Sequence, residues 1–456
     1  MKDFCLRPIK IDVKSDIKKS LDNYLKKFTK YGHFSGSVLI SMKEWIVLCK
    51  GYGMADYEHD VHNTPSTVFR IASVTKQFTS AAVLRLQEQG ALSVSDPLKK
   101  YIPDFPNGDR ITLHHLLTNT SGIPDIVNIP SIMKSVRTGM PAEMLVDKLG
   151  RQPLEFEPGE RFGYSNSGYI ILGHIIEKVS GLSYETYLNK NLFEKADMTN
   201  TGFDNAERVI KHRASGYSLS EEGLSNADFF DMSLFFGCGC MYSTVEDLYK
   251  WNKALDEELV ISKKSVEEML TPYVSDKALH YGYGWYLTEK SAYHNGITYG
   301  FKSKVWRSSN GMAVIIVLAN NDFVAIDTLV NGLVAILSRK EYKSPKLPDV
   351  QVTDKKNYGV LSGTYKSRDF SQEIFSIEEE DGRLIIKYYS YLKRVRAEVF
   401  PEKILPDQEH YFAMDLDLTI SFFKDEYGNP HRAVLKVDCD EFEAWKDEGQ
   451  AGENHE

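Results

Sequence analysis

The segment that decides the fold reads RIASVTKQF at residues 70–78. It opens a stretch from Ser73 to Gln89 without glycine or proline, and Gly90 follows, so the pattern predicts a helix. Helical residues three positions apart have Cβ atoms about 5 to 6 Å apart, so the Lys76 ammonium can reach the Ser73 hydroxyl. A serine becomes an effective nucleophile when a neighbouring base takes its proton, and the N–H groups of a helix N-terminus suit an oxyanion. The segment therefore predicts a nucleophilic serine with a lysine base.

The spacing of serine and lysine is by itself a weak signal. The pattern Ser-x-x-Lys occurs five times, beginning at Ser15, Ser73, Ser131, Ser390 and Ser421. Short motifs of this kind arise readily by chance, and at the other four positions we expect solvated surface pairs. The choice of Ser73 therefore depends on the motifs that follow it.

The composition is that of an ordinary globular protein. Hydrophobic residues make up 42% and charged residues 26% of the 456 residues. A chain of this length exceeds a single ordinary core, so we expect two domains, one of them large. The net charge of -9 and the lack of a basic patch argue against nucleic acid and anionic membrane surfaces as partners. The oligomeric state stays open.

The sequence shows no export or membrane signal. Residues 1–8 have neither the apolar core nor the cleavage site of a secretory signal. The longest apolar run, Met312 to Ala319, is far shorter than the roughly 20 residues that a bilayer requires. We therefore expect a cytoplasmic protein without a membrane span.

The cysteines indicate free thiols in a reducing compartment. They are odd in number and scattered, at Cys5, Cys49, Cys238, Cys240 and Cys439. Cys238 and Cys240 have no second pair of Cys or His ligands nearby, so they do not predict a zinc site. We expect neither a metal nor an organic cofactor.

The first part of the chain has the pattern of one mixed α/β (α+β) domain. An amphipathic helix at 15–30 precedes a hairpin of strands at 37–42 and 45–52. The middle, from about 86 to 251, has helical patterns and few strands. Further strands are expected at 283–287, 292–294, 302–307 and 312–318, followed by a helix at 325–338. An antiparallel sheet from both ends of the segment, with a helical insert, forms a coherent domain over residues 1–338.

A second domain is expected after a linker. Residues 339–357 are charged, contain two prolines and lack periodicity, which is typical of a linker. The remainder, 358–456, is rich in strand patterns separated by turns, and it predicts a small antiparallel barrel or sandwich. The strands are expected at 363–365, 373–378, 384–389, 397–400, 410–412, 416–423 and 433–437.

Further motifs follow Ser73 in an informative order. They are LLTNTSG at 116–122, PGERFGYSNSGY at 158–169, GCGCMYSTVEDL at 237–248 and HNGITYGF at 294–301. Together they resemble the serine β-lactamase and penicillin-binding protein superfamily, in its class C β-lactamase-like branch of D-aminopeptidases, D-peptidases and esterases. The resemblance covers about residues 32–338 and implies a β-lactamase-like domain. The C-terminal part is similar to the lipocalin-like barrels appended to some of these hydrolases.

The resemblance implies roles for two residues of the motif PGERFGYSNSGY at 158–169. The Tyr164 hydroxyl would point at Ser73 and Lys76. Tyr164 and Lys76 would then act together as one coupled base. Asn166 would hold Lys76 and the substrate amide through its side chain. The pattern Tyr-x-Asn recurs at Tyr187 and Tyr427, where we expect a structural role.

The last of these motifs, HNGITYGF at 294–301, departs from the commonest pattern of the superfamily. A lysine usually stands where this chain has His294, and a histidine is neutral for much of the time near pH 7. The change disfavours substrates that need a fixed positive charge for a carboxylate. Gly296 permits close approach of the backbone to a ligand, and the resemblance implies that the amides of Ile297 and Ser73 form the oxyanion hole. Cys238 and Cys240 stand where such relatives commonly have small residues.

These observations predict a serine hydrolase that cleaves ester or amide bonds of small substrates, such as D-amino-acid peptides or carboxylic esters, through an acyl-enzyme on Ser73. Its partner would be a small-molecule or peptide substrate. One alternative is β-lactamase or D-Ala-D-Ala carboxypeptidase activity, and another is a catalytically silent module for peptide binding or assembly. Transacylation differs from hydrolysis only in the acceptor, and both stay open.

Overall fold

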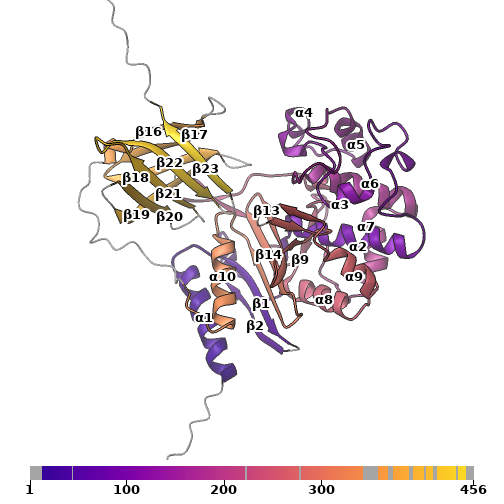
Figure 1. Ribbon diagram of the computed structural model, residues 1–456. Coiled ribbons are helices and arrows are strands. Elements are labelled where there is room, and N and C mark those ends of the chain that lie inside the picture. Colours follow the sequence, from indigo (N-terminus) through magenta and orange to yellow (C-terminus); the bar gives the residue numbers. More distant parts are fainter. Residues whose placement is uncertain are drawn as a thin grey trace, which may run out of the picture.

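The structure is a computed structural model of the chain (Figure 1). It describes residues 13–43, 45–220, 223–276, 279–342, 358–367, 373–389, 394–404, 407–413, 418–437 and 440–447. Cys5, Cys439 and the Ser390 pattern lie outside the described residues, as do residues 343–357 of the expected linker. The domain boundary at 339–357 therefore stays a prediction.

One antiparallel sheet joins distant parts of the chain. Its strands follow the order β10-β11-β12-β13-β14-β15-β1-β2. Their bounds are β1 Gly36–Met42, β2 Trp45–Tyr52, β10 Val274–Asp276, β11 Leu279–Tyr281, β12 Tyr286–Leu287, β13 Ser291–Thr298, β14 Phe301–Ser308 and β15 Ala313–Ala319. Val38 of β1 lies opposite Val317 of β15. This pairing confirms the expected mixed fold, in which the sheet draws on both ends of the segment.

The strand β15 explains why this sheet has a core on each face. Its sequence, AVIIVLA, is apolar without alternation, which is the pattern of a strand buried on both faces. Successive side chains of a strand point to opposite faces. Accordingly, Ile315 and Val317 enter one hydrophobic cluster, while Ile316 and Leu318 enter the other.

Two helices cover the face that carries Ile315. They are α1 Val13–Lys30 and α10 Ile326–Leu337 (Figure 1). Leu21 and Leu25 of α1 lie four residues apart and are fully buried against the sheet. Both helices agree with the sequence predictions to within two residues.

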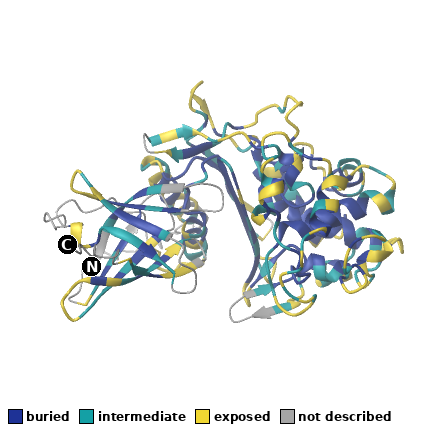
Figure 2. Cartoon of the chain, turned by 90° about the horizontal axis from the view of Figure 1, so that it is seen from above, coloured by how far each residue is buried: buried dark blue, intermediate teal, exposed yellow. Residues whose placement is uncertain are grey.

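The opposite face carries the helices of the predicted insert. Figure 2 shows buried residues gathered where these helices face one another and the sheet. Their bounds are α2 Thr75–Glu88, α3 Leu113–Leu117, α4 Pro130–Met133, α5 Ala142–Gly150, α6 Asn166–Ser180, α7 Tyr184–Leu188, α8 Val245–Asp256 and α9 Lys263–Met269. Most residues of α2 are buried, as expected of a helix that is surrounded by other elements.

Short strands and turns complete this part. The strands are β3 Met54–Asp56, β4 Val61–His62, β5 Phe69–Arg70, β6 Gly202–Phe203, β7 Tyr217–Ser220, β8 Gly223–Asn226 and β9 Met241–Ser243. The 3-10 turns are η1 Ala72–Val74, η2 Leu98–Lys100, η3 Ile126–Asn128, η5 Met232–Phe235 and η7 Tyr358–Val360, and η4 Asn189–Phe193 is a π turn. Phe69 pairs with Ser243 and Arg70 with Tyr242, so β9 fixes the chain just before Ser73.

The ends of three predicted elements differ from those in the structure. The helix expected at 73–89 begins as the turn η1 before α2. The strand expected at 283–287 is reduced to β12. Gly284, at φ +75°, bends the chain there toward α2, and a Cβ at this position would lie 2.8 Å from the Lys76 carbonyl oxygen. Strand β13, in contrast, extends on both sides of the expected 292–294.

The C-terminal part is a closed antiparallel barrel of strands β16 to β23 (Figure 1). Their bounds are β16 Gly363–Lys366, β17 Glu373–Glu380, β18 Arg383–Tyr389, β19 Arg394–Ile404, β20 Gln408–Ala413, β21 Leu418–Lys424, β22 Pro430–Val437 and β23 Asp440–Lys446. Tyr365 of β16 pairs with Lys446 of β23 and closes the ring. The expected barrel is thereby confirmed over the described residues.

The sequence predicts seven of these strands and misses β23. Its sequence, DEFEAWK, is dominated by charged residues, and the structure exposes Glu441 and Glu443 while it buries Ala444. A strand that contributes so little apolar surface has no clear hydrophobic pattern. The barrel interior is filled by aromatic and aliphatic side chains, among them the buried Tyr365 and Tyr411.

No helix among the residues that the structure describes has both the length and the apolar character required to cross a bilayer.

We predict that Gly332→Ala destabilises the protein, although alanine favours helices by about 1 kcal/mol. A Cβ at Gly332 would lie 2.0 Å from the Tyr24 hydroxyl oxygen, and Tyr24 is buried and donates to the Thr328 carbonyl. Overpacking of this kind costs about 1 to 3 kcal/mol. Calorimetric unfolding should therefore show a lower midpoint than the wild type. The exposed neighbour Asn331→Ala is the control, and its midpoint should not fall. A stabilised Gly332→Ala would contradict the packing argument.

Candidate active site

The backbone around Ser73 is held from both sides. The Ile71 amide donates to the Met241 carbonyl of β9 at 2.9 Å, and the Ser303 hydroxyl of β14 donates to the Ile71 carbonyl at 2.7 Å. Ala72 follows with φ +44°, a left-handed conformation that is costly for a residue with a side chain. Ser73 is thus the middle residue of η1, at the N-terminal entry to α2, where N–H groups lack intrahelical partners.

Lys76 points its ammonium at Ser73. It is fully buried in the first turn of α2, and its Nζ donates to Ser73 Oγ at 3.1 Å, Asn166 Oδ1 at 2.7 Å and the Cys238 carbonyl at 3.1 Å. An ammonium has three donors, so these three acceptors satisfy it. Burial lowers the pKa of Lys76 to about 8, while the nearby Cys238 and Asp125 act against that shift. A lysine of this kind is partly neutral near pH 7 and can accept a proton.

Tyr164 approaches Ser73 from the loop before α6. Its hydroxyl donates to Ser73 Oγ at 3.0 Å, and Lys76 Nζ lies 4.9 Å from its ring centroid. Burial raises the pKa of Tyr164 well above its ordinary value of 10. The phenol therefore keeps its proton at neutral pH, and the geometry makes Lys76 the better proton acceptor of the two.

Asn166 is the first residue of α6 and contacts two charged groups. Its Oδ1 accepts from Lys76, whereas its Nδ2 lies 3.2 Å and 3.1 Å from the two carboxylate oxygens of Asp125. The Asn166 amide nitrogen also donates to Asp125 Oδ1, at 3.2 Å. Sequence analysis does not identify Asp125. It stands three residues after the LLTNTSG motif in a Pro-containing turn, and that position alone indicates a turn.

His294 lies in β13, on the same side as Tyr164, and their ring centroids are 6.4 Å apart. Its Nδ1 lies 2.7 Å from the Asn295 carbonyl oxygen, which can only accept, so this nitrogen carries the proton. Its Nε2 then accepts from the Tyr281 hydroxyl at 3.2 Å. Burial lowers the pKa of His294 to about 3, with a further contribution from Lys76. The imidazole ring is therefore neutral. Sequence analysis does not identify Tyr281, which is the hydrogen-bond partner of His294 Nε2.

Gly296 lets β13 approach the turn that carries Ser73. A Cβ at Gly296 would lie 2.2 Å from the Ile71 carbonyl oxygen and 3.1 Å from the Ala72 Cβ. A larger residue would therefore push the strand away from η1. Ile297 follows Gly296, and its side chain is 47% exposed, outside the buried core. It is therefore the backbone of β13 that lies close to η1 at this point.

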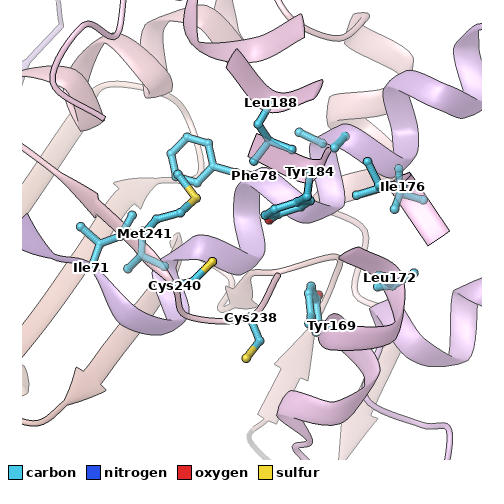
Figure 3. Packing of buried hydrophobic residues seen from close by; sticks show 14 of the residues in the cluster. Ile71, Phe78, Tyr169, Leu172, Ile176, Tyr184, Leu188, Cys238, Cys240 and Met241 are labelled. Atoms are coloured by element: carbon cyan, nitrogen blue, oxygen red, sulfur yellow. The ribbon is translucent and has the colours of Figure 1, made fainter. Parts of the chain in front are cut away.

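Cys238 and Cys240 are buried in the core beneath the site. Figure 3 shows their sulfur atoms pointing in opposite directions. Burial raises the pKa of the Cys238 thiol to about 12 and also raises that of Cys240, so both thiols are protonated. The contribution of Cys238 to the site is its carbonyl oxygen. Within the described residues, no group of three or more His, Cys, Asp and Glu side chains could hold a metal ion.

The arrangement thus joins Ser73, Lys76, Tyr164 and Asn166 by direct hydrogen bonds, with His294 and Gly296 on the adjoining strand. Chemically, such an arrangement can support acyl transfer, because a hydroxyl lies between a lysine of lowered pKa and a protonated phenol.

Comparisons with known proteins identify the family of this chain. The sequence model of the Beta-lactamase family matches residues 21–335. The putative penicillin-binding protein PbpX of Bacillus subtilis (strain 168) is 34% identical over 305 residues, which are 67% of this chain and 74% of that protein.

Two solved structures share the fold. The octameric penicillin-binding protein homologue from Pyrococcus abyssi has a TM-score of 0.65 and 26% identity, covering 93% of this chain and 99% of that chain. The D-amino acid amidase from Ochrobactrum anthropi SV3, in complex with L-phenylalanine amide, has a TM-score of 0.64 and 24% identity, covering 71% of this chain and 99% of that chain. The family match spans more than half of the chain, and this protein therefore belongs to the Beta-lactamase family, as a serine hydrolase of the β-lactamase and penicillin-binding protein superfamily.

Proposed function

We propose that this protein hydrolyses ester or amide bonds of small substrates through an acyl-enzyme on Ser73. Ser73 Oγ attacks the carbonyl carbon, and its proton passes to the neutral amine of Lys76. The amides of Ser73 and Ile297 stabilise the oxyanion, a contribution of about 3 to 4 kcal/mol per donor in other enzymes. As the intermediate collapses, Tyr164 protonates the leaving group, and the Lys76 ammonium returns a proton to Tyr164. Water then attacks the acyl-enzyme by the same route and releases the acid.

The observation that carries this proposal is the environment of Lys76. A lysine ammonium buried without partners would be strongly unfavourable, and here three acceptors hold it against Ser73 Oγ. The same burial lowers the pKa of Lys76 to about 8, which is the property that a lysine base requires near neutral pH. A silent binding module would have no need for a nucleophile and base held in this way.

The HNGITYGF motif at 294–301 favours substrates without an obligatory carboxylate. His294 is neutral, and its two ring nitrogens are engaged with Asn295 and Tyr281. It therefore offers no fixed positive charge to a substrate anion. Carboxylic esters and D-amino-acid amides fit this site better than β-lactams or D-Ala-D-Ala peptides, which carry a carboxylate. The D-amino acid amidase with the same fold supports the inclusion of D-amino-acid amides among the test substrates.

Intact-mass measurement after exposure to a fluorophosphonate, and separately to a penicillin, tests this proposal. We expect a phosphonate adduct on the wild type that is absent from Ser73→Ala, and little or no penicilloyl adduct. Adducts with both reagents would favour a penicillin-recognising enzyme. The absence of any adduct would favour the binding module.

We predict that Ser73→Ala lowers kcat/KM for an activated ester by at least about 1,000-fold. The residue contributes the nucleophile. Of the two side chains that donate to its hydroxyl, Lys76 keeps Asn166 Oδ1 and the Cys238 carbonyl as acceptors. Circular dichroism and the thermal midpoint should therefore match those of the wild type. Full activity in a folded Ser73→Ala protein would refute the assignment of the nucleophile.

We predict that acylation accelerates with rising pH, with a midpoint near 8, because Lys76 must lose its proton before it can accept that of Ser73. The sign follows from the base: the neutral fraction of Lys76 grows as pH increases. His294 contributes no step near neutral pH, since its pKa is lowered to about 3. The second-order rate constant of phosphonate labelling, measured from about pH 6 to pH 10, gives the profile. A rate that is independent of pH or falls across this range would exclude Lys76 as the base.

A further inference from the structure

The carboxylate of Asp125 controls how Asn166 is oriented. Asp125 lies at the start of η3, where Oδ1 accepts from the Val127 amide at 3.5 Å. The same carboxylate accepts from the Asn166 backbone amide and from Asn166 Nδ2 through both oxygens. It therefore ties the loop after α3 to the first residue of α6.

The two neighbours of the Asn166 side chain permit one orientation of its amide. A carboxylate can only accept and must face the NH₂ group, whereas an ammonium can only donate and must face the oxygen. Asp125 stands on one side and Lys76 on the other. A flipped amide would place NH₂ against the ammonium and oxygen against the carboxylate, and both contacts would be repulsive.

We infer that Asp125 is a positioning residue for the reaction at Ser73: its carboxylate holds the Asn166 amide so that Oδ1 faces Lys76. This inference rests on the proposed acyl-enzyme function and deepens it. Asn166 then fixes the position of the Lys76 ammonium beside Ser73. Asn166 is itself buried, which agrees with this assignment.

Asp125 also supplies negative charge to the surroundings of Lys76. The titratable groups that face the ammonium come from five places in the chain and are Asp125, Tyr164, Tyr169, Cys238 and His294. Burial raises the pKa of both tyrosines and of the thiol, and it lowers that of His294, so these four groups are neutral. The pKa of Asp125 is raised by burial on balance, although Lys76 and Asn166 act against this rise by favouring its charged form. An anion close to Lys76 favours the ammonium.

Asp125→Asn tests the inference, because it retains the size of the side chain and removes its charge. We expect the limiting rate of phosphonate labelling at high pH to fall by about 10- to 100-fold, since the amide that positions Lys76 is no longer fixed. The midpoint of the pH profile should move below that of the wild type, since the anion that favours the ammonium is lost. A residue with a purely structural role would not move this midpoint.

Two further variants complete the test. Asp231→Asn is the matched control: Asp231 caps the 3-10 turn η5 through the Ser233 amide at 3.0 Å and is not among the charges that act on Lys76. Its profile should equal that of the wild type. Asp125→Glu retains the charge, so we expect a lower limiting rate with the wild-type midpoint. This variant also tests the inference if Asp125→Asn does not fold, because a wild-type limiting rate in Asp125→Glu would overturn it.

The outcomes separate the inference from the proposed function. A wild type that forms no Ser73-dependent adduct refutes the proposed function. A labelled wild type together with an Asp125→Asn variant of unchanged midpoint overturns the inference alone.

Discussion

The site depends on the burial of one ammonium. Taking the charge of Lys76 out of water is unfavourable unless hydrogen-bond acceptors replace the solvent. The acceptors come from η1, from the start of α6 and from the loop before β9. These parts of the chain lie far apart in the sequence, so the site exists only once the helical part has closed around α2. The same burial lowers the pKa of Lys76, so the feature that costs free energy of folding also makes the lysine able to act as a base.

The sheet supplies the second constraint, which is the distance between β13 and the turn that carries Ser73. Ser303 of β14 holds the Ile71 carbonyl, and Gly296 of β13 leaves room for it. The backbone of Ile71 and Ala72 is thus fixed from one side by β9 and from the other by the sheet. Ala72 keeps its left-handed conformation because both neighbours determine its position.

Much of the fold can be predicted from the sequence because its signals are local. The apolar run of β15 and the amphipathic spacing of α1 predict buried elements directly. The ordered motifs predict which serine matters among five similar patterns. The prediction fails where a local signal is missing or overridden: β23 is too highly charged to resemble a strand, and Gly284 bends a predicted strand toward α2.

The sequence by itself determined that Ser73 and Lys76 lie three residues apart at the start of a predicted helix, where that separation places two side chains on one face. It also determined that the motif at 294–301 begins with a histidine where a lysine is usual. Only the tertiary structure decided that Tyr164 keeps its proton, that both nitrogens of His294 are engaged, and that Asp125 faces Asn166. Burial and contacts between distant residues set these properties, and no local pattern encodes either of them.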